Sequence, residues 1–176
     1  MLDISRLTVG TIRIEPSEMD LEALVVEIVE RHSEQFRVAG IEVKLSSSGA
    51  TYGYWDRLRL DQVLSNLFLN AIKYAPRAVL EVRIKNEMHQ VTAEIEDHGP
   101  GIKKEDQEKI FERFARKNVD VNIAGLGLGL YIAKQVVVAH GGSIEVESKP
   151  AKGACFKLTL PKLPPKPAES FTGLNC

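Results

Sequence analysis

The stretch from Asp61 to Lys73, DQVLSNLFLNAIK, carries two helical patterns at once. Apolar residues recur at spacings of three and four, which predicts a helix with one face in the core. That apolar set is Leu60, Val63, Leu64, Leu67, Ala71 and Ile72. At about 100° per residue, a second, polar face also lines up. This polar set is Gln62, Asn66, Asn70 and Lys73. A fold for this chain must bury the apolar face, and the polar face must either form a binding site or lie in solvent.

Two interpretations of the polar face fit the helix taken alone. Carboxamide oxygens are hard ligands that suit Mg²⁺, and a lysine nearby can reach the phosphates that such a metal bridges. The same side chains also describe an ordinary solvated helix surface, which is the simpler interpretation of one helix. Motifs elsewhere in the chain are needed to distinguish a metal–phosphate site from a solvated helix surface.

Composition narrows the class of protein. The chain has 176 residues, of which 44% are hydrophobic and 27% charged, enough for one globular domain with a core. A formal net charge of -1 gives no reason to expect a nucleic-acid partner. No apolar run approaches the roughly 18 residues of a membrane span, and the first residues do not resemble a signal peptide. With only Cys155 and Cys176, a disulfide framework is not expected, which favours a reducing, cytoplasmic location.

The first half of the chain alternates helical and strand patterns. We expect a short strand at 11–14, and a helix from an N-cap at Asp20 to Gly40. A half-buried strand at 41–45, a turn at 46–49 and a strand at 52–55 follow. Asp56 is predicted to cap the polar-faced helix, which ends at Ala75–Pro76.

The second half adds two hairpins and a long polar segment. Strands are predicted at 79–85 and 91–96, and again at 144–146 and 155–160, with an apolar helix at 130–139 between the pairs. Residues 103–124 are charged and polar apart from one short apolar helix around Ile110 and Phe111. Hairpins imply antiparallel neighbours. We therefore predict an α+β two-layer sandwich, in which three helices cover one face of a mixed, mostly antiparallel sheet.

Two glycine-rich motifs could carry chemistry. Asp97-His-Gly-Pro-Gly-Ile102 directly follows a strand, so its carboxylate could accept an exocyclic amine while Gly99 and Gly101 admit a flat ring. A tight turn with a turn-forming aspartate explains the same residues equally well. Gly125-Leu-Gly-Leu-Gly129 opens a helix, where free N–H groups favour an anion such as phosphate. Lys152 and Gly153 alone indicate only a hairpin turn.

In combination the motifs are far more specific. The Asn-bearing helix, Asp-x-Gly-x-Gly-Ile, Ile-Phe-Glu-Arg-Phe (110–114), Gly-x-Gly-x-Gly and a closing Gly-Ala-Cys-Phe turn (153–156) occur in one order. Over residues 1–161 this resembles the catalytic, ATP-binding domain of sensor histidine kinases, within the GHKL superfamily of gyrases, chaperones and kinases. The resemblance implies ATP and Mg²⁺ as cofactors and a mobile ATP lid at about 103–124.

The resemblance also assigns roles to residues. Asn70 would bind Mg²⁺, with Asn66 on the metal or its water, and Lys73 would contact phosphate; these three form the catalytic set. Asp97 would accept the adenine amine, and Arg113 would meet phosphate or the partner domain. The remaining nucleotide contacts it implies are Tyr74, Gly99, Gly101, Ile102, Gly125, Leu126, Gly127, Leu128, Gly129 and Cys155.

Some positions depart from the family pattern. Ala124 stands where Gly is frequent, Leu126 where Ser or Thr is frequent, His98 where Asn is common, and Cys155 near a frequent Thr. No histidine of the chain is followed by the acidic residue that marks the family's phosphoacceptor. Residues 1–10 instead resemble the end of the dimerisation domain that carries that histidine. We therefore expect 1–10 to be a remnant of that domain, 11–161 the ATP-binding domain, and 162–176 a proline-rich flexible tail.

The sequence thus predicts a histidine protein kinase catalytic domain of two-component signalling. It would donate the γ-phosphate of ATP to a histidine on a dimerisation domain absent from this chain, with a response regulator downstream. The fragment is expected to be monomeric and its parent homodimeric, and membrane anchoring of the parent stays open. The alternative is a nucleotide-binding regulatory or scaffold module of the same fold that has lost phosphotransfer.

Overall fold

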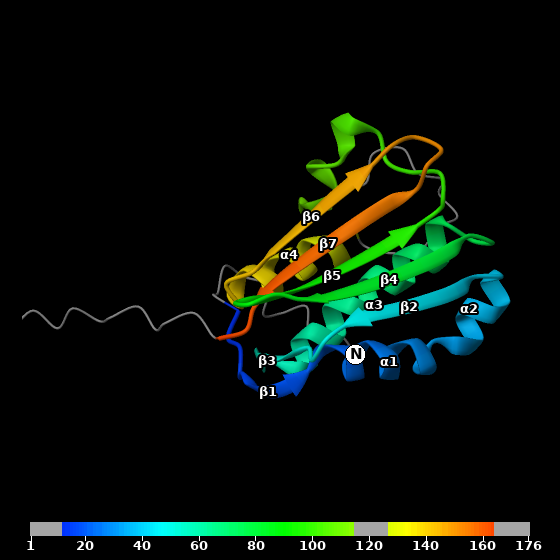
Figure 1. Ribbon diagram of the computed structural model, residues 1–176. Helices are drawn as coiled ribbons and strands as arrows, with labels where there is room; N and C mark the ends of the chain where they lie inside the picture. The colour runs from blue at the N-terminus through cyan, green and yellow to red at the C-terminus, as the bar shows by residue number, and fades with distance from the viewer. Residues whose placement is uncertain (1–11, 115–126, 164–176) are drawn as a thin grey trace, which may run out of the picture.

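The computed structural model describes residues 12–114 and 127–163. The expectations for residues 1–10 and 164–176, and for Ala124, Gly125 and Leu126, lie outside these ranges. A five-stranded sheet forms one layer, with strand order β2-β4-β5-β7-β6 (Figure 1). The strands are β2 (Glu42–Ser48), β4 (Val79–Asn86), β5 (Gln90–Asp97), β6 (Ser143–Ser148) and β7 (Ala154–Pro161). β2 and β4 are parallel and the other neighbours antiparallel, so the prediction of a mixed, mostly antiparallel sheet is confirmed.

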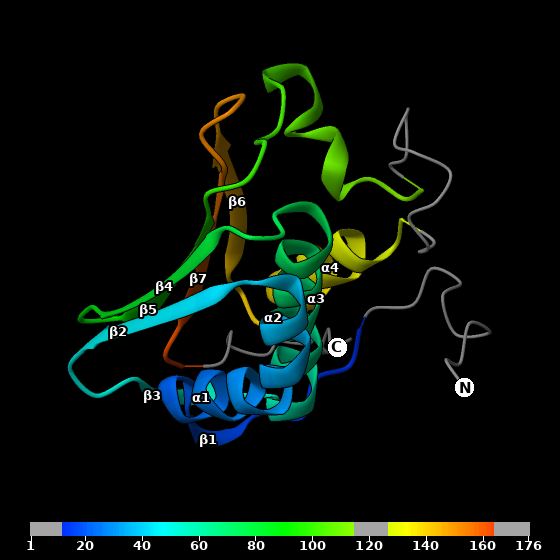
Figure 2. The same cartoon turned by 90° about the vertical axis from the view of Figure 1, so that its right-hand side faces the viewer.

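The helices form the second layer, on one face of the sheet (Figure 2). They are α1 (Leu21–Arg31), the short α2 (Ser33–Ala39), α3 (Arg57–Tyr74) and α4 (Gly129–Ala139). The apolar face of α3 is buried as predicted, with Phe68 in place of the half-buried Ile72. Alternate residues of each central strand, such as Val82, Ile95 and Phe156, meet these helices in a single core. This burial is the main force that holds the two layers together.

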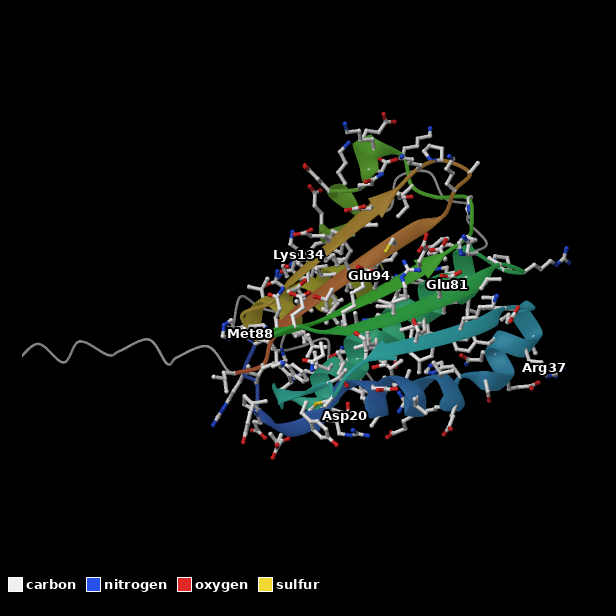
Figure 3. All side chains as sticks on the ribbon, in the orientation of Figure 1. Asp20, Arg37, Glu81, Met88, Glu94 and Lys134 are labelled. Carbon is white, nitrogen blue, oxygen red and sulfur yellow. The ribbon has the colours of Figure 1, made fainter. Side chains whose placement is uncertain are left out.

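The opposite face of the sheet carries charge in place of helices. Arg83 on β4 bonds to Glu81 at 2.8 Å, to Glu94 at 3.2 Å and to Glu96 at 2.5 Å, across two strands. Figure 3 shows Glu81 and Glu94 on this outer face. Because side chains alternate along a strand, Ile95 points toward the helices while Glu94 and Glu96 point away from them. One face of the sheet is therefore packed in the core and the other faces solvent.

Both predicted helix caps are confirmed. The carboxylate of Asp20 accepts a hydrogen bond from the N–H of Glu22 at 3.0 Å, and that of Asp56 accepts from the N–H of Arg59 at 3.1 Å. His140, which is buried, ties the end of α4 to the same cap. Its Nε2 accepts the N–H of Asp56 at 3.0 Å, while its Nδ1 bonds to the carbonyl of Val136 at 2.8 Å. The start of α3 and the end of α4 are therefore fixed to each other.

The short strand predicted at 11–14 is wrong. Its described part, 12–14, is not a strand, and β1 (Ser17–Asp20) begins only after Pro16. β1 pairs antiparallel with β3 (Tyr52–Trp55) in a separate two-stranded sheet. Only Met19 of β1 is buried, so pairing with β3 defines this strand and an apolar alternation does not.

The single helix predicted to run to Gly40 is divided at His32. The ring Nδ1 of His32 lies 2.9 Å from the carbonyl oxygen of Ile28, and its backbone leaves the helical region at ψ 7°. A side chain that competes for a helix carbonyl favours such a break. The new direction of α2 buries Phe36 edge-on against Phe68, with ring centroids 6.0 Å apart. Gly40 ends α2 in the left-handed conformation as expected.

The turn predicted at 46–49 starts too early. β2 continues through Ser48, which pairs with Lys85 of β4. Backbone pairing with β4 outweighs the low strand propensity of three successive serines. In the polar segment, the short helix expected at Ile110 and Phe111 is the 3₁₀ turn η3 (Lys109–Phe111), preceded by η2 (Lys104–Asp106). Each helix within the described ranges is too short or too polar to cross a bilayer.

Candidate functional site

The polar face of α3 lies beside the start of α4. The amide Nδ2 of Asn66 donates to the carbonyl oxygen of Gly129 at 3.2 Å. Asn70 and Lys73 continue the line along α3, and all three side chains are half-buried. The Nζ of Lys73 lies 5.1 Å from the ring centroid of Tyr74, whose side chain is exposed. At Asn66 the polar face is thus part of the contact between α3 and α4, and none of the three side chains is fully exposed.

The first residues of α4 include glycines, so other groups can come close to the backbone there. Gly127 has φ +67°, a conformation that favours glycine, and Leu128 is the N-cap residue. A Cβ on Gly129 would lie 3.3 Å from the Oδ1 of Asn66, so a larger side chain would crowd the amide oxygen. The N–H groups of a first helical turn have no partner within the helix, and the helix dipole is positive there. This corner therefore combines a positive helix end with an amide oxygen.

A second corner is built around Asp97 at the end of β5. Its Oδ1 accepts two backbone N–H groups, from Gly99 at 2.9 Å and from Ala154 at 3.3 Å. Asp97 is half-buried, and this burial raises the pKa of its carboxyl, against the opposing effect of the two N–H donors. In the sheet register Asp97 pairs with Leu80 and Ala154, which places it in the row that faces the helices. Its carboxylate is therefore held rigidly on the inner face.

The glycines after Asp97 are required by packing. A Cβ on Gly99 would come within 2.5 Å of the Cβ of Ala75, at the end of α3. A Cβ on Gly101 would overlap the carbonyl oxygen of Lys149, and Gly101 also has φ +73°. The loop after β5 therefore lies directly on α3 and on the β6–β7 turn. Both the turn interpretation and the interpretation as a close-approach surface remain compatible with this geometry.

A small hydrogen-bond network fixes Ile102. Its N–H donates to the Oγ of Ser148 at 2.7 Å, and that hydroxyl donates to the carbonyl of Gly153 at 2.6 Å. Gln107 donates to the carbonyls of Ile102 and Ser148 at 3.0 and 2.8 Å. Sequence reasoning missed Ser148 and Gln107, because the residues that they contact lie 46 and 41 positions away in the chain. Gly153 belongs to the predicted closing turn, but the hydrogen bond that its carbonyl accepts from Ser148 was not predicted.

The segment from Phe111 to Phe114 lies against α4 and β7. Phe111 is buried and meets Phe156 of β7 edge-on, with ring centroids 6.4 Å apart. The guanidinium of Arg113 lies over the ring of Tyr131 in the first turn of α4, at 4.8 Å from its centroid. Phe114 is 66% exposed, so of the two phenylalanines in the motif at 110–114 only Phe111 is packed in the core.

Cys155 is not brought together with the other predicted residues. It pairs with Glu96 and Glu147 in the row of the outer face, whereas Asp97 and Ala154 occupy the inner row. Burial and the neighbouring glutamates raise the pKa of its thiol. The sequence placed Cys155 in an apolar strand but could not give its side, because the register of a strand decides which face a residue takes.

Residues 55–164 match the family described as "Histidine kinase-, DNA gyrase B-, and HSP90-like ATPase". The chain belongs to this family. It is a histidine kinase catalytic domain, and the ATPase family implies that it binds ATP.

Relatives and solved structures agree with this assignment. The sensor-like histidine kinase SenX3 of Mycobacterium tuberculosis (strain ATCC 25618 / H37Rv) is 35% identical over 166 residues, which are 93% of this chain and 40% of SenX3. The nucleotide-free catalytic domain of the histidine kinase ThkA matches with a TM-score of 0.76 at 29% identity, over 85% of this chain and 97% of that one.

Two further structures show larger assemblies. Full-length ShkA in complex with AMPPNP matches with a TM-score of 0.80 at 27% identity, over 92% of this chain and 34% of ShkA. ThkA in complex with the response regulator protein TrrA matches with a TM-score of 0.74 at 28% identity, over 88% of this chain and 44% of that one. The histidine kinase domain described above spans about two fifths of the length of SenX3.

Proposed function

We propose that this domain binds Mg²⁺–ATP and donates the γ-phosphate to a histidine on a dimerisation domain outside the chain. The contact between Asn66 and Gly129 carries the proposal. It sets a carboxamide from α3 against the N-terminal turn of α4, so groups that suit a metal and groups that suit phosphate share one corner. Asp97 on the inner face offers an acceptor for the adenine amine.

The residues present fit a magnesium ion bound together with phosphates. Because the Nδ2 of Asn66 donates to the carbonyl of Gly129, its Oδ1 is the atom left for a ligand. Asn70 offers a second amide oxygen one turn later, and Lys73 a cation one turn beyond that. When bound, Mg²⁺ would neutralise charge on the phosphates. We assign Asn70, together with Asn66, to the metal, and Lys73 to the phosphates.

The residues of the chain would act by positioning. Asp97 would orient the adenine through its fixed carboxylate, with Gly99, Gly101 and Ile102 shaping the base pocket and Tyr74 packing on the nucleotide. The N–H groups at Gly127, Leu128 and Gly129 would receive phosphate oxygens. Gly125 and Leu126 keep their assignments as proposals from the sequence, whereas Cys155, in the outer row of the sheet, is left out of the proposed nucleotide contacts. An amide at position 66 cannot accept a proton from water. We therefore expect slow hydrolysis of ATP by this chain alone and transfer to a separate histidine.

The proposed partners are inferred from the family and from the fraction of a related kinase that this chain spans. The chain spans 40% of SenX3, so a phosphoacceptor-histidine dimerisation domain is expected in the remaining part of the parent protein. A response regulator is the expected downstream acceptor, because the similar kinase ThkA forms a complex with one. We expect the parent to be a homodimer and this chain alone to be a monomer, without nucleic acid as a partner.

The test uses the parent protein with its native upstream region. Incubation with γ-labelled ATP and Mg²⁺ should give a phosphorylated histidine, recognised by its lability in acid and stability in base. Asn70→Ala should abolish the Mg²⁺-dependent gain in ATP affinity, whereas Ser65→Ala, a matched change on the same helix, should leave it intact. ATP binding without phosphohistidine would favour a regulatory module that has lost transfer. Equal Mg²⁺ dependence in both variants would overturn the metal assignment.

A further inference from the structure

We propose that Ser148 is a positioning residue for the adenine site, because its hydroxyl orients the peptide group that donates to the carboxylate of Asp97. The inference rests on the proposed function, since it concerns the base that Asp97 is proposed to bind. Ser148 is the last residue of the edge strand β6 and is half-buried. In the sheet register it lies opposite Ala154, in the row that faces the helices. A chain of hydrogen bonds connects its hydroxyl to Asp97.

The two neighbours of the Ser148 hydroxyl fix its role as donor and acceptor. The N–H of Ile102, which can only donate, lies 2.7 Å from the Oγ. The carbonyl oxygen of Gly153, which can only accept, lies 2.6 Å from the same Oγ. The hydroxyl therefore accepts from Ile102 and donates to Gly153. One side chain thus joins the loop after β5 to the turn between β6 and β7.

The carbonyl that Ser148 contacts belongs to the same peptide group as an N–H that Asp97 accepts. A trans peptide group is planar and directs its C=O and its N–H to opposite sides, and no peptide bond within 12–114 or 127–163 is cis. The group between Gly153 and Ala154 therefore has one end on each partner. Its carbonyl accepts from Ser148, and its N–H donates to the Oδ1 of Asp97 at 3.3 Å. A rotation of this group would weaken both bonds together.

The hydrogen bonds of this chain all run in one direction, toward the carboxylate. Because the Oγ of Ser148 accepts an N–H, its own O–H is a stronger donor to the peptide group. Because the carbonyl of that group accepts the O–H, its N–H is in turn a stronger donor to Asp97. This N–H favours the ionised carboxyl and lowers the pKa of Asp97, against the larger effect of burial. Ser148 therefore acts on the carboxylate through one peptide group.

The consequence concerns which base is bound. The Oδ1 of Asp97 accepts the N–H groups of Gly99 and Ala154, which leaves the Oδ2 for the amine of adenine. When one of the two N–H bonds is weakened, the carboxylate can turn and the Oδ2 loses its fixed position. A base with a carbonyl in place of the amine gains nothing from that position. Ser148 would therefore strengthen the preference for adenine, without contributing to the binding of the phosphates.

The experiment measures the affinities of this chain for ATP and for inosine triphosphate, whose base has that carbonyl, by calorimetry with Mg²⁺ present. Ser148→Ala removes the hydroxyl and should reduce the preference for ATP about 2- to 10-fold. Ser148→Thr keeps a hydroxyl and should retain the preference. Ser48→Ala is the matched control: Ser48 ends the opposite edge strand β2, and its hydroxyl donates to the carbonyl of Ile84 at 3.5 Å. This control should bind both nucleotides like the wild type.

A pH titration of the nucleotide-free wild type tests the same chain of hydrogen bonds without relying on the Ser148 variants. In nuclear magnetic resonance spectra, the amide signals of Ala154 and Ile102 should both shift at the pH at which Asp97 ionises. The charges of His98 and Glu96 also act on Asp97. The Asp97→Asn variant is therefore titrated in parallel, and it should lose the shared midpoint.

The other outcomes contradict separate statements. Equal losses of affinity for both nucleotides in Ser148→Ala would show a packing role and overturn the inference. A titration that moves the amide signal of Ala154 but leaves that of Ile102 unchanged would do the same. An unchanged preference in Ser148→Ala, beside a loss in Asp97→Asn, would overturn the role of Ser148 and leave the adenine assignment intact. A chain that binds neither nucleotide would refute the proposed function, while the titration would still test Ser148.

Discussion

Replacing Asp97 with Asn should separate the stability of the fold from the binding of adenine. The carboxylate Oδ1 accepts the N–H groups of Gly99 and Ala154 at 2.9 and 3.3 Å, and the amide oxygen of an asparagine can accept both. Burial raises the pKa of Asp97, which means that its charge is held at a cost in the folded state. Removing the charge should therefore leave the free energy of unfolding of the nucleotide-free protein unchanged or higher at pH 7.

The pH dependence has a definite sign. Because the pKa of Asp97 is higher in the folded than in the unfolded chain, the folded state binds more protons in the range between them. The contribution of Asp97 to stability is therefore fully present below the unfolded pKa and is lost as the pH rises through the folded pKa. The Asp97→Asn variant lacks this loss, so its advantage over the wild type should be present at pH 7 and vanish in acid.

Nucleotide binding should change in the opposite direction. With its amide oxygen already used by Gly99 and Ala154, the Asp97→Asn variant would present an N–H₂ group to the adenine amine, a donor against a donor. Loss of a hydrogen bond to a charged group is worth about 1.5–3 kcal/mol, or roughly 10- to 150-fold in the dissociation constant.

The assays are calorimetric titration with ATP and urea unfolding at two pH values. Inosine triphosphate, which has a carbonyl in place of the amine, is the matched control ligand and should lose less affinity than ATP or gain some. Unchanged ATP affinity in Asp97→Asn would refute the adenine assignment. A large loss of stability at pH 7 would contradict the reasoning about the buried charge.

Three further substitutions test the packing around the site. Gly129→Ala places a Cβ 3.3 Å from the Oδ1 of Asn66, but alanine is also a better helix former than glycine. Urea unfolding should therefore show up to about 1 kcal/mol more stability, while calorimetry should show weaker Mg²⁺–ATP binding. Unaltered binding would argue against a ligand at that oxygen. Gly153→Ala would overlap a backbone carbonyl at the end of β5 at φ +82°, so the thermal midpoint should fall sharply, whereas a wild-type midpoint would mean that the turn can shift. His140→Phe leaves the N–H of Asp56 without its acceptor and should cost about 1–3 kcal/mol in urea unfolding; a cost near zero would indicate that another acceptor replaces the ring.

Several features of the fold could be predicted from the sequence, because residues close together in the chain determine them. Asp20 and Asp56 cap their helices, Gly40 ends α2, and the apolar face of α3 is buried. Each of these depends on residues within one or two turns of sequence. The family resemblance rests on the same kind of information, since its motifs are short and lie at defined element ends.

The errors arise where distant residues decide the outcome. Ser47 and Ser48 belong to a strand because β4 pairs with them, and no pattern near the serines announces this partner. The inner or outer side of Cys155 depends on the register of β7 against β5. The stack of Arg113 on Tyr131 joins residues of two separate elements. A single sequence contains no direct signal for such contacts.

The order of strands in the sheet has a consequence for how the domain assembles. β7 is the last strand along the described chain, yet it lies between β5 and β6, and β6 joins the sheet only through it. The N–H of Ala154, at the start of β7, also completes the setting of Asp97, 57 residues earlier. During synthesis, neither β6 nor the carboxylate corner could reach its final state before β7 emerges. Such non-local closure is slow to form, and a ligand that recognises only the closed sheet would favour the completed chain over every shorter one.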